Sequence, residues 1–177
     1  MPQEQFEAGM HIRYGGNGIC LIERIDDVPF PGPKPVRRCY VLRPLRNSGM
    51  EISVPLDNEQ LCAKMLPLRT KEEIDRMLAE ALAQDAMPWQ EERKLRSSEF
   101  RKILLGGDAQ ELLRMIRCIL KQRAALQAIG KRLSSADDNA RKDAARQLDE
   151  EFAFSLGVTP REAGQYICDH LLERNAQ

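Results

Sequence analysis

A chain of 177 residues has room for one domain or two small ones. Its 27 basic and 27 acidic side chains cancel, so the chain as a whole carries no excess charge that would draw it to nucleic acid or to a membrane surface. No apolar run reaches the length of a membrane helix, and the first residues lack the basic and apolar regions of a signal peptide, so we expect a cytoplasmic protein without a membrane contact.

The cysteines and histidines argue against a metal site. The five cysteines are scattered and form no CxxC pair, and the two histidines are far apart in the sequence. An odd number of scattered cysteines is typical of a reducing compartment. No serine or cysteine has the context of a catalytic nucleophile, and Gly15–Gly18 is not followed by a helical pattern that would make it a phosphate loop. We therefore expect neither an enzyme nor a bound cofactor.

Residues 1–67 show the period-two alternation of antiparallel strands. The alternating runs are residues 10–14, 19–25, 38–42 and 50–54. Between the first two runs, the glycine-rich residues 15–18 predict a hairpin turn. Residues 26–36 contain four prolines, which lack the backbone donor of a ladder strand, so this segment is expected to be a loop or an extended surface segment. Four or five short strands in this length predict a small barrel or a strongly bent sheet.

Residues 68–177 change to the helical period. Thr70 with Glu73, and Asp108 with Glu111, have the spacing of capping boxes and predict two helix starts. Thr159 followed by a proline predicts a third start. The expected fold class is therefore α+β, with a β domain at 1–67 followed by an all-helical domain at 68–177 of about five helices.

Positive charge is concentrated in the middle of the chain, where residues 88–132 carry eleven cations and five anions. The only tryptophan, Trp89, follows a proline there, and five cations come after it: Arg93, Lys94, Arg96, Arg101 and Lys102. Cations bind phosphates and a flat ring can lie against or between bases, so this segment is suited to nucleic acid. The alternative interpretation is a core tryptophan at a domain joint beside a solvated helix face.

Two groups of residues together resemble the CarD/CdnL family of transcription regulators. The first is the opening FEAGM, YGGNGI and IERI at residues 6–25, which resembles the polymerase-interaction module of the transcription-repair coupling factor as well, and it continues through residues 40–42 and 50–55. The second is Pro88-Trp89 with the basic stretch and the LGGD of residues 105–108, together with Glu150-Glu151-Phe152. The resemblance covers nearly the whole chain.

The resemblance implies a Tudor-like antiparallel β-barrel that docks on the β subunit of bacterial RNA polymerase. It also implies that the helical domain contacts promoter DNA at the upstream edge of the melted bubble. The tryptophan matching Trp89 wedges into the minor groove there and hinders collapse of the bubble, without strong sequence specificity. Such a protein is associated with the nucleoid through the polymerase, and we expect a monomer in solution.

The expected polymerase contacts lie on the β domain, where the strand edge at 50–54 is suited to strand addition. They are Arg24, Arg37, Arg38, Met50, Ile52, Ser53 and Val54. The chain departs from the family pattern at Gly15 and Asn17, and Ser53 stands where an arginine is expected. The alternative function is a protein-interaction adaptor of the same fold, which binds polymerase or another partner without DNA and buries Trp89 against the helix at 70–86.

Overall fold

The computed structural model describes residues 5–33 and 35–172. It has the α+β architecture expected from the sequence, with a β-sheet followed by helices. The chain divides into two compact units between Leu68 and Arg69, one residue beyond the boundary that the change of period indicates. None of the helices in this described part of the chain has the length and apolarity that a bilayer span requires.

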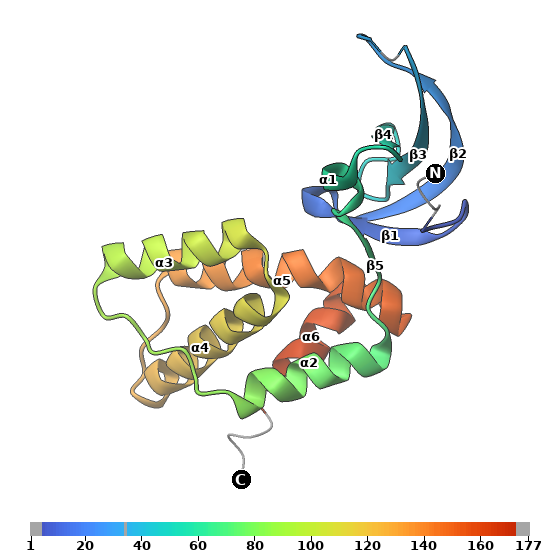
Figure 1. Ribbon diagram of the computed structural model, residues 1–177. Helices are drawn as coiled ribbons and strands as arrows, with labels where there is room; N and C mark the ends of the chain where they lie inside the picture. The colour runs from blue at the N-terminus through green and yellow to red at the C-terminus, as the bar shows by residue number, and fades with distance from the viewer. Residues whose placement is uncertain (1–4, 34, 173–177) are drawn as a thin grey trace. The chain divides into compact units, whose positions relative to one another are not determined.

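The first unit is built on an antiparallel sheet with the strand order β4-β3-β2-β1-β5 (Figure 1). In the described residues its elements are β1 (His11–Tyr14), η1 (Gly15–Asn17), β2 (Ile19–Pro29), β3 (Val36–Pro44), β4 (Ile52–Pro55), α1 (Glu59–Cys62) and β5 (Met65–Pro67). Strands β4 and β5 form the two edges, and no pairing between them is seen in the part of the chain that the structure describes. The sheet is therefore open, and the closed Tudor-like barrel that we expect from the resemblance is not confirmed.

The β2–β3 hairpin is longer than its prolines indicate. The ladder continues through Asp26↔Cys39 as far as Pro29↔Val36, so the expectation of a loop over the whole of 26–36 is wrong. Pro29 is the last residue of β2, so the backbone N–H that proline lacks does not interrupt the ladder of hydrogen bonds. The backbone N–H of Phe30 donates to the carbonyl of Pro35 at 2.9 Å and closes the hairpin. The prolines thus limit the length of the ladder without excluding one.

The sheet buries one set of alternating side chains. In β1 the burial alternates strictly, with Ile12 and Tyr14 inside. They belong to a core made of Phe6, Ile12, Tyr14, Cys20, Ile22, Tyr40, Leu42, Val54, Leu56 and Met65. Sequence patterning missed α1 and β5, because each is too short to show a period.

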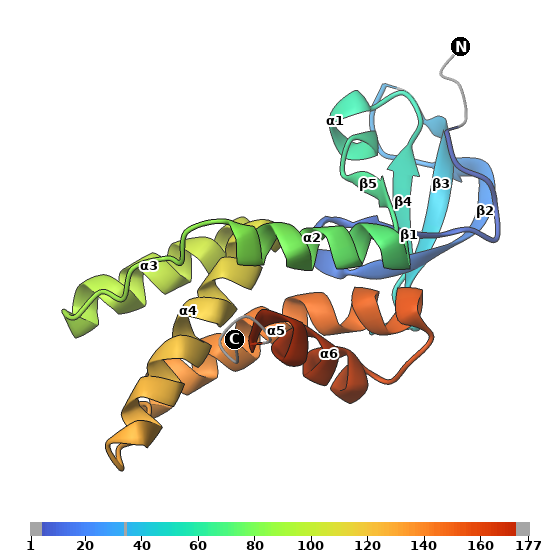
Figure 2. The same ribbon diagram turned by 90° about the horizontal axis from the view of Figure 1, so that it is seen from below.

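The second unit, within residues 69–172, has five helices, as the sequence predicts (Figure 2). They are α2 (Lys71–Ala83), α3 (Arg93–Gly106), α4 (Ala109–Ala128), α5 (Ser135–Leu156) and α6 (Pro160–Leu172). The predicted capping box at α2 is present: the Thr70 hydroxyl accepts from the Glu73 N–H at 3.2 Å, and Glu73 accepts from the Thr70 N–H at 2.8 Å. Arg117 of α4 caps the other end of α2 by donating to the carbonyls of Ala81 and Gln84.

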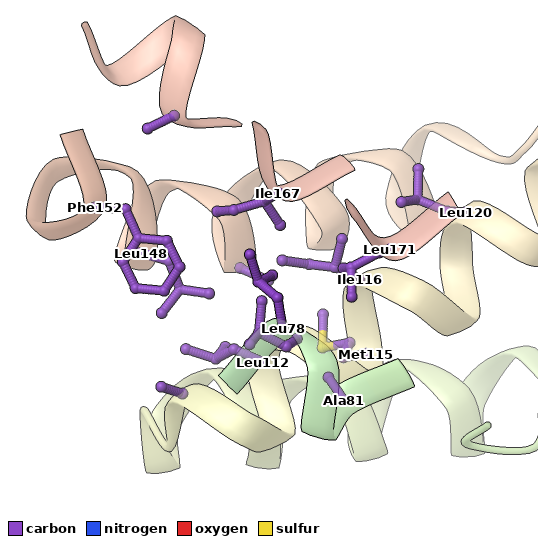
Figure 3. Packing of buried hydrophobic residues seen from close by; sticks show 14 of the residues in the cluster. Leu78, Ala81, Leu112, Met115, Ile116, Leu120, Leu148, Phe152, Ile167 and Leu171 are labelled. Atoms are coloured by element: carbon purple, nitrogen blue, oxygen red, sulfur yellow. The ribbon is translucent and has the colours of Figure 1, made fainter. Parts of the chain in front are cut away.

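The core of this unit lies where α2, α4, α5 and α6 meet (Figure 3). Leu78 of α2 and Leu112 of α4 belong to the same buried cluster as Leu148 and Phe152 of α5. All four side chains are almost fully buried. Helix α3 adds Phe100 to this cluster from the side. A partly buried ion pair fixes the start of the unit: the Arg69 Nη1 donates to the Glu151 Oε2 at 2.7 Å, and the Arg69 N–H donates to Oε1 at 3.0 Å.

Helices α5 and α6 lie side by side, and Asp149 stands in their contact (Figure 2). Gly164 of α6 makes room for it, since a Cβ there would lie 3.3 Å from both carboxylate oxygens. The Oδ1 atom of Asp149 is buried and has no hydrogen-bond partner among the described residues. Burial raises the pKa of Asp149 from 3.8 to about 6, against the lowering effect of Arg141 and Arg146.

This buried carboxyl predicts a pH-dependent stability. The folded pKa of Asp149 exceeds the unfolded value, so the buried carboxyl does not reduce the stability below about pH 4. The free energy of unfolding falls as the pH rises from there through 6, because the carboxyl then ionises in a buried position. We expect Asp149→Asn to increase the free energy of unfolding by roughly 2 kcal/mol at pH 7.5 and by little at pH 4. Urea unfolding at both pH values checks this. The exposed Asp143→Asn is the control, and an equal gain at both pH values would contradict the prediction.

Candidate nucleic-acid interface

The segment between α2 and α3 is extended because of its proline. Residues 85–91 have no regular structure, as expected where Pro88 disfavours a helical conformation in the residue before it. Glu92 occupies the N-cap of α3 without a side-chain cap. At the other end, Gly107 has a φ of 67°, a left-handed conformation that glycine adopts without strain, and Asp108 then caps α4. Trp89 therefore lies on the short connection between the end of α2 and the start of α3.

Helix α3 separates its residues into two faces. Its inward face carries Arg96 and Phe100, which are buried, with Ile103 and Leu104 partly buried. Its outward face carries four exposed cations with the serines between them: Arg93, Lys94, Ser97, Ser98, Arg101 and Lys102. We call these six residues the basic face. Five of them, all except Lys102, line a shallow hollow on the surface.

The basic face is not neutralised by acids of its own unit. Within the described residues, none of Arg93, Lys94, Arg101 and Lys102 forms an ion pair, although the charge of Arg93 helps to lower the pKa of Asp137. The one acid of α3 is Glu99, which is about 160° from Arg101 around the helix axis but three residues before Lys102 and about 60° from it, so it lies at the edge of the basic face. Cations and hydroxyl donors along two helical turns can bind the oxygens of a polyanion such as a phosphate backbone.

Trp89 is partly buried at the edge of the helical core. Its indole makes an edge contact with the Phe100 ring, with the ring centroids 6.2 Å apart and the planes at 62°. The Arg96 guanidinium carbon lies 4.4 Å from the indole centroid, over one face of the ring. The accessible part of the indole therefore lies on its other face or along its rim.

Arg96 must be removed from the set of surface cations that the sequence indicates. It is only 8% exposed, and its Nε and Nη2 donate to the two carboxylate oxygens of Asp137, both at 2.9 Å. Its Nη1 donates to the carbonyls of Gln90 and Glu91. With these donors occupied inside the unit, Arg96 does not share the surface of the other four cations. The sequence grouped it with them because charge alone does not show which face of a helix a residue is on.

The sequence analysis missed Asp137 and Ser134. The Ser134 hydroxyl accepts from the Asp137 N–H at 3.2 Å and donates to Asp137 Oδ2 at 2.6 Å, at the start of α5. Serine followed three residues later by aspartate is a recognisable helix start. Nothing local in the sequence shows that Arg96, 41 residues earlier, pairs with this aspartate.

The residues expected to contact polymerase are in the first unit, and they differ in their ion pairs and in their exposure to solvent. Arg24 pairs with Glu51 at 3.0 Å, and Arg37 pairs with Asp57. Arg38 is exposed near the start of β3. Met50 is 42% exposed beside the start of β4, an edge strand.

The remaining three expected contacts are in β4 itself. Ile52 and Ser53 are partly buried. Val54 is fully buried in the core of the sheet, so its side chain is not available to a partner and only its backbone could take part in strand addition. Of the expected contacts, burial excludes only the Val54 side chain, and the other six residues stay a prediction.

The sequence matches no model of a protein family and no curated protein. The part of the chain that the structure describes contains no group of three or more histidine, cysteine, aspartate or glutamate residues that could hold a metal ion.

The basic face predicts a salt-dependent affinity for a polyanion. We expect the double variant Lys94→Gln/Arg101→Gln to weaken binding to duplex DNA and to reduce the slope of log K against log salt concentration by about two. Fluorescence titration of labelled DNA over a series of salt concentrations measures both quantities.

The matched control is Lys142→Gln/Arg146→Gln, which removes the same charge from exposed, acid-paired positions of α5. An equal change in the two double variants would show that net charge matters and that the basic face does not.

Proposed function

We propose that this chain is a cytoplasmic transcription regulator of the CarD/CdnL type, which docks on the RNA polymerase β subunit and stabilises the promoter open complex. The observation that carries the proposal is the basic face of α3 together with a partly buried indole that packs on the same helix. Four cations on one side of α3, which form no ion pair among the described residues, provide attachment to the phosphates of either strand. The indole, in contact with Phe100 and Arg96 of that helix, provides a flat apolar group.

The proposed mechanism is a shift of equilibrium between closed and melted DNA. A factor that binds the melted junction more tightly than the duplex favours opening by that difference in affinity alone. Unstacking a base step costs a few kcal/mol, and an apolar ring that occupies the gap offsets part of this cost. A preference of about 1.4 kcal/mol changes the ratio tenfold. Trp89 is held against Phe100 and Arg96 before any DNA arrives, so little freedom remains to be lost on binding.

The open sheet of the first unit is proposed to be the polymerase-docking, Tudor-like module. Its edge strand β4 offers backbone groups for strand addition, and Met50 adds an exposed apolar contact beside that edge. Docking places the helical unit near the DNA and supplies a high local concentration, so that its own affinity for DNA does not need to be high.

The adaptor without DNA contact is the second candidate. It is favoured by the partial burial of Trp89 and by two leucines of α3, Leu95 and Leu105, which are 52% and 81% exposed. Exposed leucines beside cations suit an acidic protein partner. Against it, the ring and cation contacts of the indole are to Phe100 and Arg96 of α3, and the exposed cations of α3 gather on one face.

Removing the indole tests the first candidate. We expect Trp89→Ala to shorten the lifetime of open complexes by about tenfold, because the preference for the melted junction is lost. Competitor-challenge decay of preformed complexes measures this lifetime. The control is Phe154→Ala, which removes another partly exposed aromatic side chain from the helical unit. Two results together would favour the adaptor: an open-complex lifetime that is unchanged in a folded Trp89→Ala protein, and a lifetime that the protein no longer prolongs once it carries Leu95→Gln/Leu105→Gln.

Docking through β4 is tested at the two edges of the sheet. We expect Met50→Asp/Ser53→Asp to weaken binding to the isolated polymerase β lobe at least about tenfold, because charges are placed along the edge that pairs. Biolayer interferometry with the full chain measures the affinity. Leu66→Asp is the control, since Leu66 is 45% exposed on β5 at the opposite edge. Loss of binding in the control alone would move the docking site to β5.

A further inference from the structure

Arg96 restrains Trp89 through one contact with the ring and two hydrogen bonds to the backbone that follows it. Its guanidinium covers one face of the indole at 4.4 Å. Its Nη1 donates to the carbonyls of Gln90 at 2.9 Å and Glu91 at 3.2 Å, the two residues that follow Trp89. One side chain therefore restrains both the ring and the backbone next to it. A guanidinium over the face of an indole adds a cation–π attraction, which is stronger where the pair is shielded from water.

The guanidinium is itself held by a rigid anion. Asp137 accepts from Nε and Nη2 in a two-pronged pair, and the Ser134 hydroxyl and the first turn of α5 fix the carboxylate from the other side. Burial alone would raise the pKa of Asp137, but hydrogen bonds from Arg96 and Ser134 outweigh it and hold the pKa below its ordinary value. The carboxylate is thus charged at neutral pH.

We infer that the Arg96–Asp137 pair is a positioning device for Trp89: it closes one face of the indole and leaves the other face or the rim to meet DNA. This inference rests on the proposed function and names Arg96 as a positioning residue instead of a phosphate contact. The ring is then suited to press on a base step from one side. Full intercalation would need both faces free, and the guanidinium occupies one of them.

The alternative is that the Arg96–Asp137 pair only stabilises the fold. A second ion pair in the same unit serves as a control for this alternative. Arg69 and Glu151 form this partly buried ion pair, with side-chain exposures of 20% and 8%. Glu151 is fourteen residues beyond Asp137 on α5, which is about 21 Å along the helix. Breaking either pair leaves an arginine without its carboxylate and destabilises the fold. Glu151→Gln therefore lowers stability at a distance from the indole, although less than Asp137→Asn, because Arg69 is more exposed than Arg96.

The emission of the single tryptophan tests the positioning role directly. In the full-length protein we expect Asp137→Asn and Arg96→Lys to raise the quenching of Trp89 by acrylamide and to lower its anisotropy, because the indole loses the planar group above it. Lysine keeps the charge but cannot make the two-pronged pair, so Arg96→Lys covers the case in which Asp137→Asn fails to fold. Glu151→Gln is expected to leave both signals unchanged. Unchanged signals in Arg96→Lys would overturn the inference.

A double-mutant cycle on open-complex lifetime separates positioning from DNA contact. If Arg96 acts through the indole, Arg96→Lys shortens the lifetime by up to about tenfold, and Trp89→Ala/Arg96→Lys equals Trp89→Ala alone. The salt slope of DNA binding stays that of the wild type, since no phosphate contact is lost. The inference would be overturned if the double variant shortened the lifetime by the product of the two single effects. A salt slope of DNA binding reduced by about one in Arg96→Lys would overturn it as well. If Trp89→Ala has no effect on lifetime while the emission changes as expected, the proposed function fails and the positioning stands.

Discussion

The Arg96 guanidinium joins three parts of the helical unit that are distant in the sequence. It connects the start of α5, the first turn of α3 and the extended segment that carries Trp89. Most helices of this size bury only aliphatic and aromatic side chains, and an isolated arginine in such a place would cost several kcal/mol. Here the donors are satisfied by a carboxylate and two carbonyls, so the charge is stable inside. Arg96 and Phe100 are the two buried residues through which α3 is joined to the rest of the unit.

This arrangement determines which side of α3 faces solvent. With Arg96 and Phe100 turned inward, helical geometry leaves the remaining cations outward on the basic face. Helices α3 and α5 run in the same direction (Figure 1). The Arg96–Asp137 pair joins their starts, and the Gln147 side chain donates to the Leu104 carbonyl at 3.0 Å near the end of α3. The basic face is thus an outcome of core packing, and the four outward cations need no acid to orient them.

Local patterns predicted much of this fold, and long-range pairings account for what they missed. The alternation in β1 and the capping box at Thr70 act over a few residues, and both appear in the structure as predicted. The open sheet, the ladder to Pro29 and the burial of Val54 depend on strands that meet across the fold. Of the candidate site, the outward cations and Trp89 were found from the sequence. The inward turn of Arg96 was not, because its partner Asp137 is 41 residues away.

The charge balance explains why a DNA contact on this chain would require docking. Four phosphate contacts give a salt slope of about −3.6, so affinity for DNA falls more than a hundredfold between 50 and 200 mM salt. A chain of zero net charge has no further attraction to compensate for this loss. In the proposed function, tethering through the first unit would raise the local concentration towards millimolar and restore occupancy without new contacts. Weak, sequence-independent attachment would then suffice, because under this proposal the polymerase selects the promoter and the indole acts where the strands have separated.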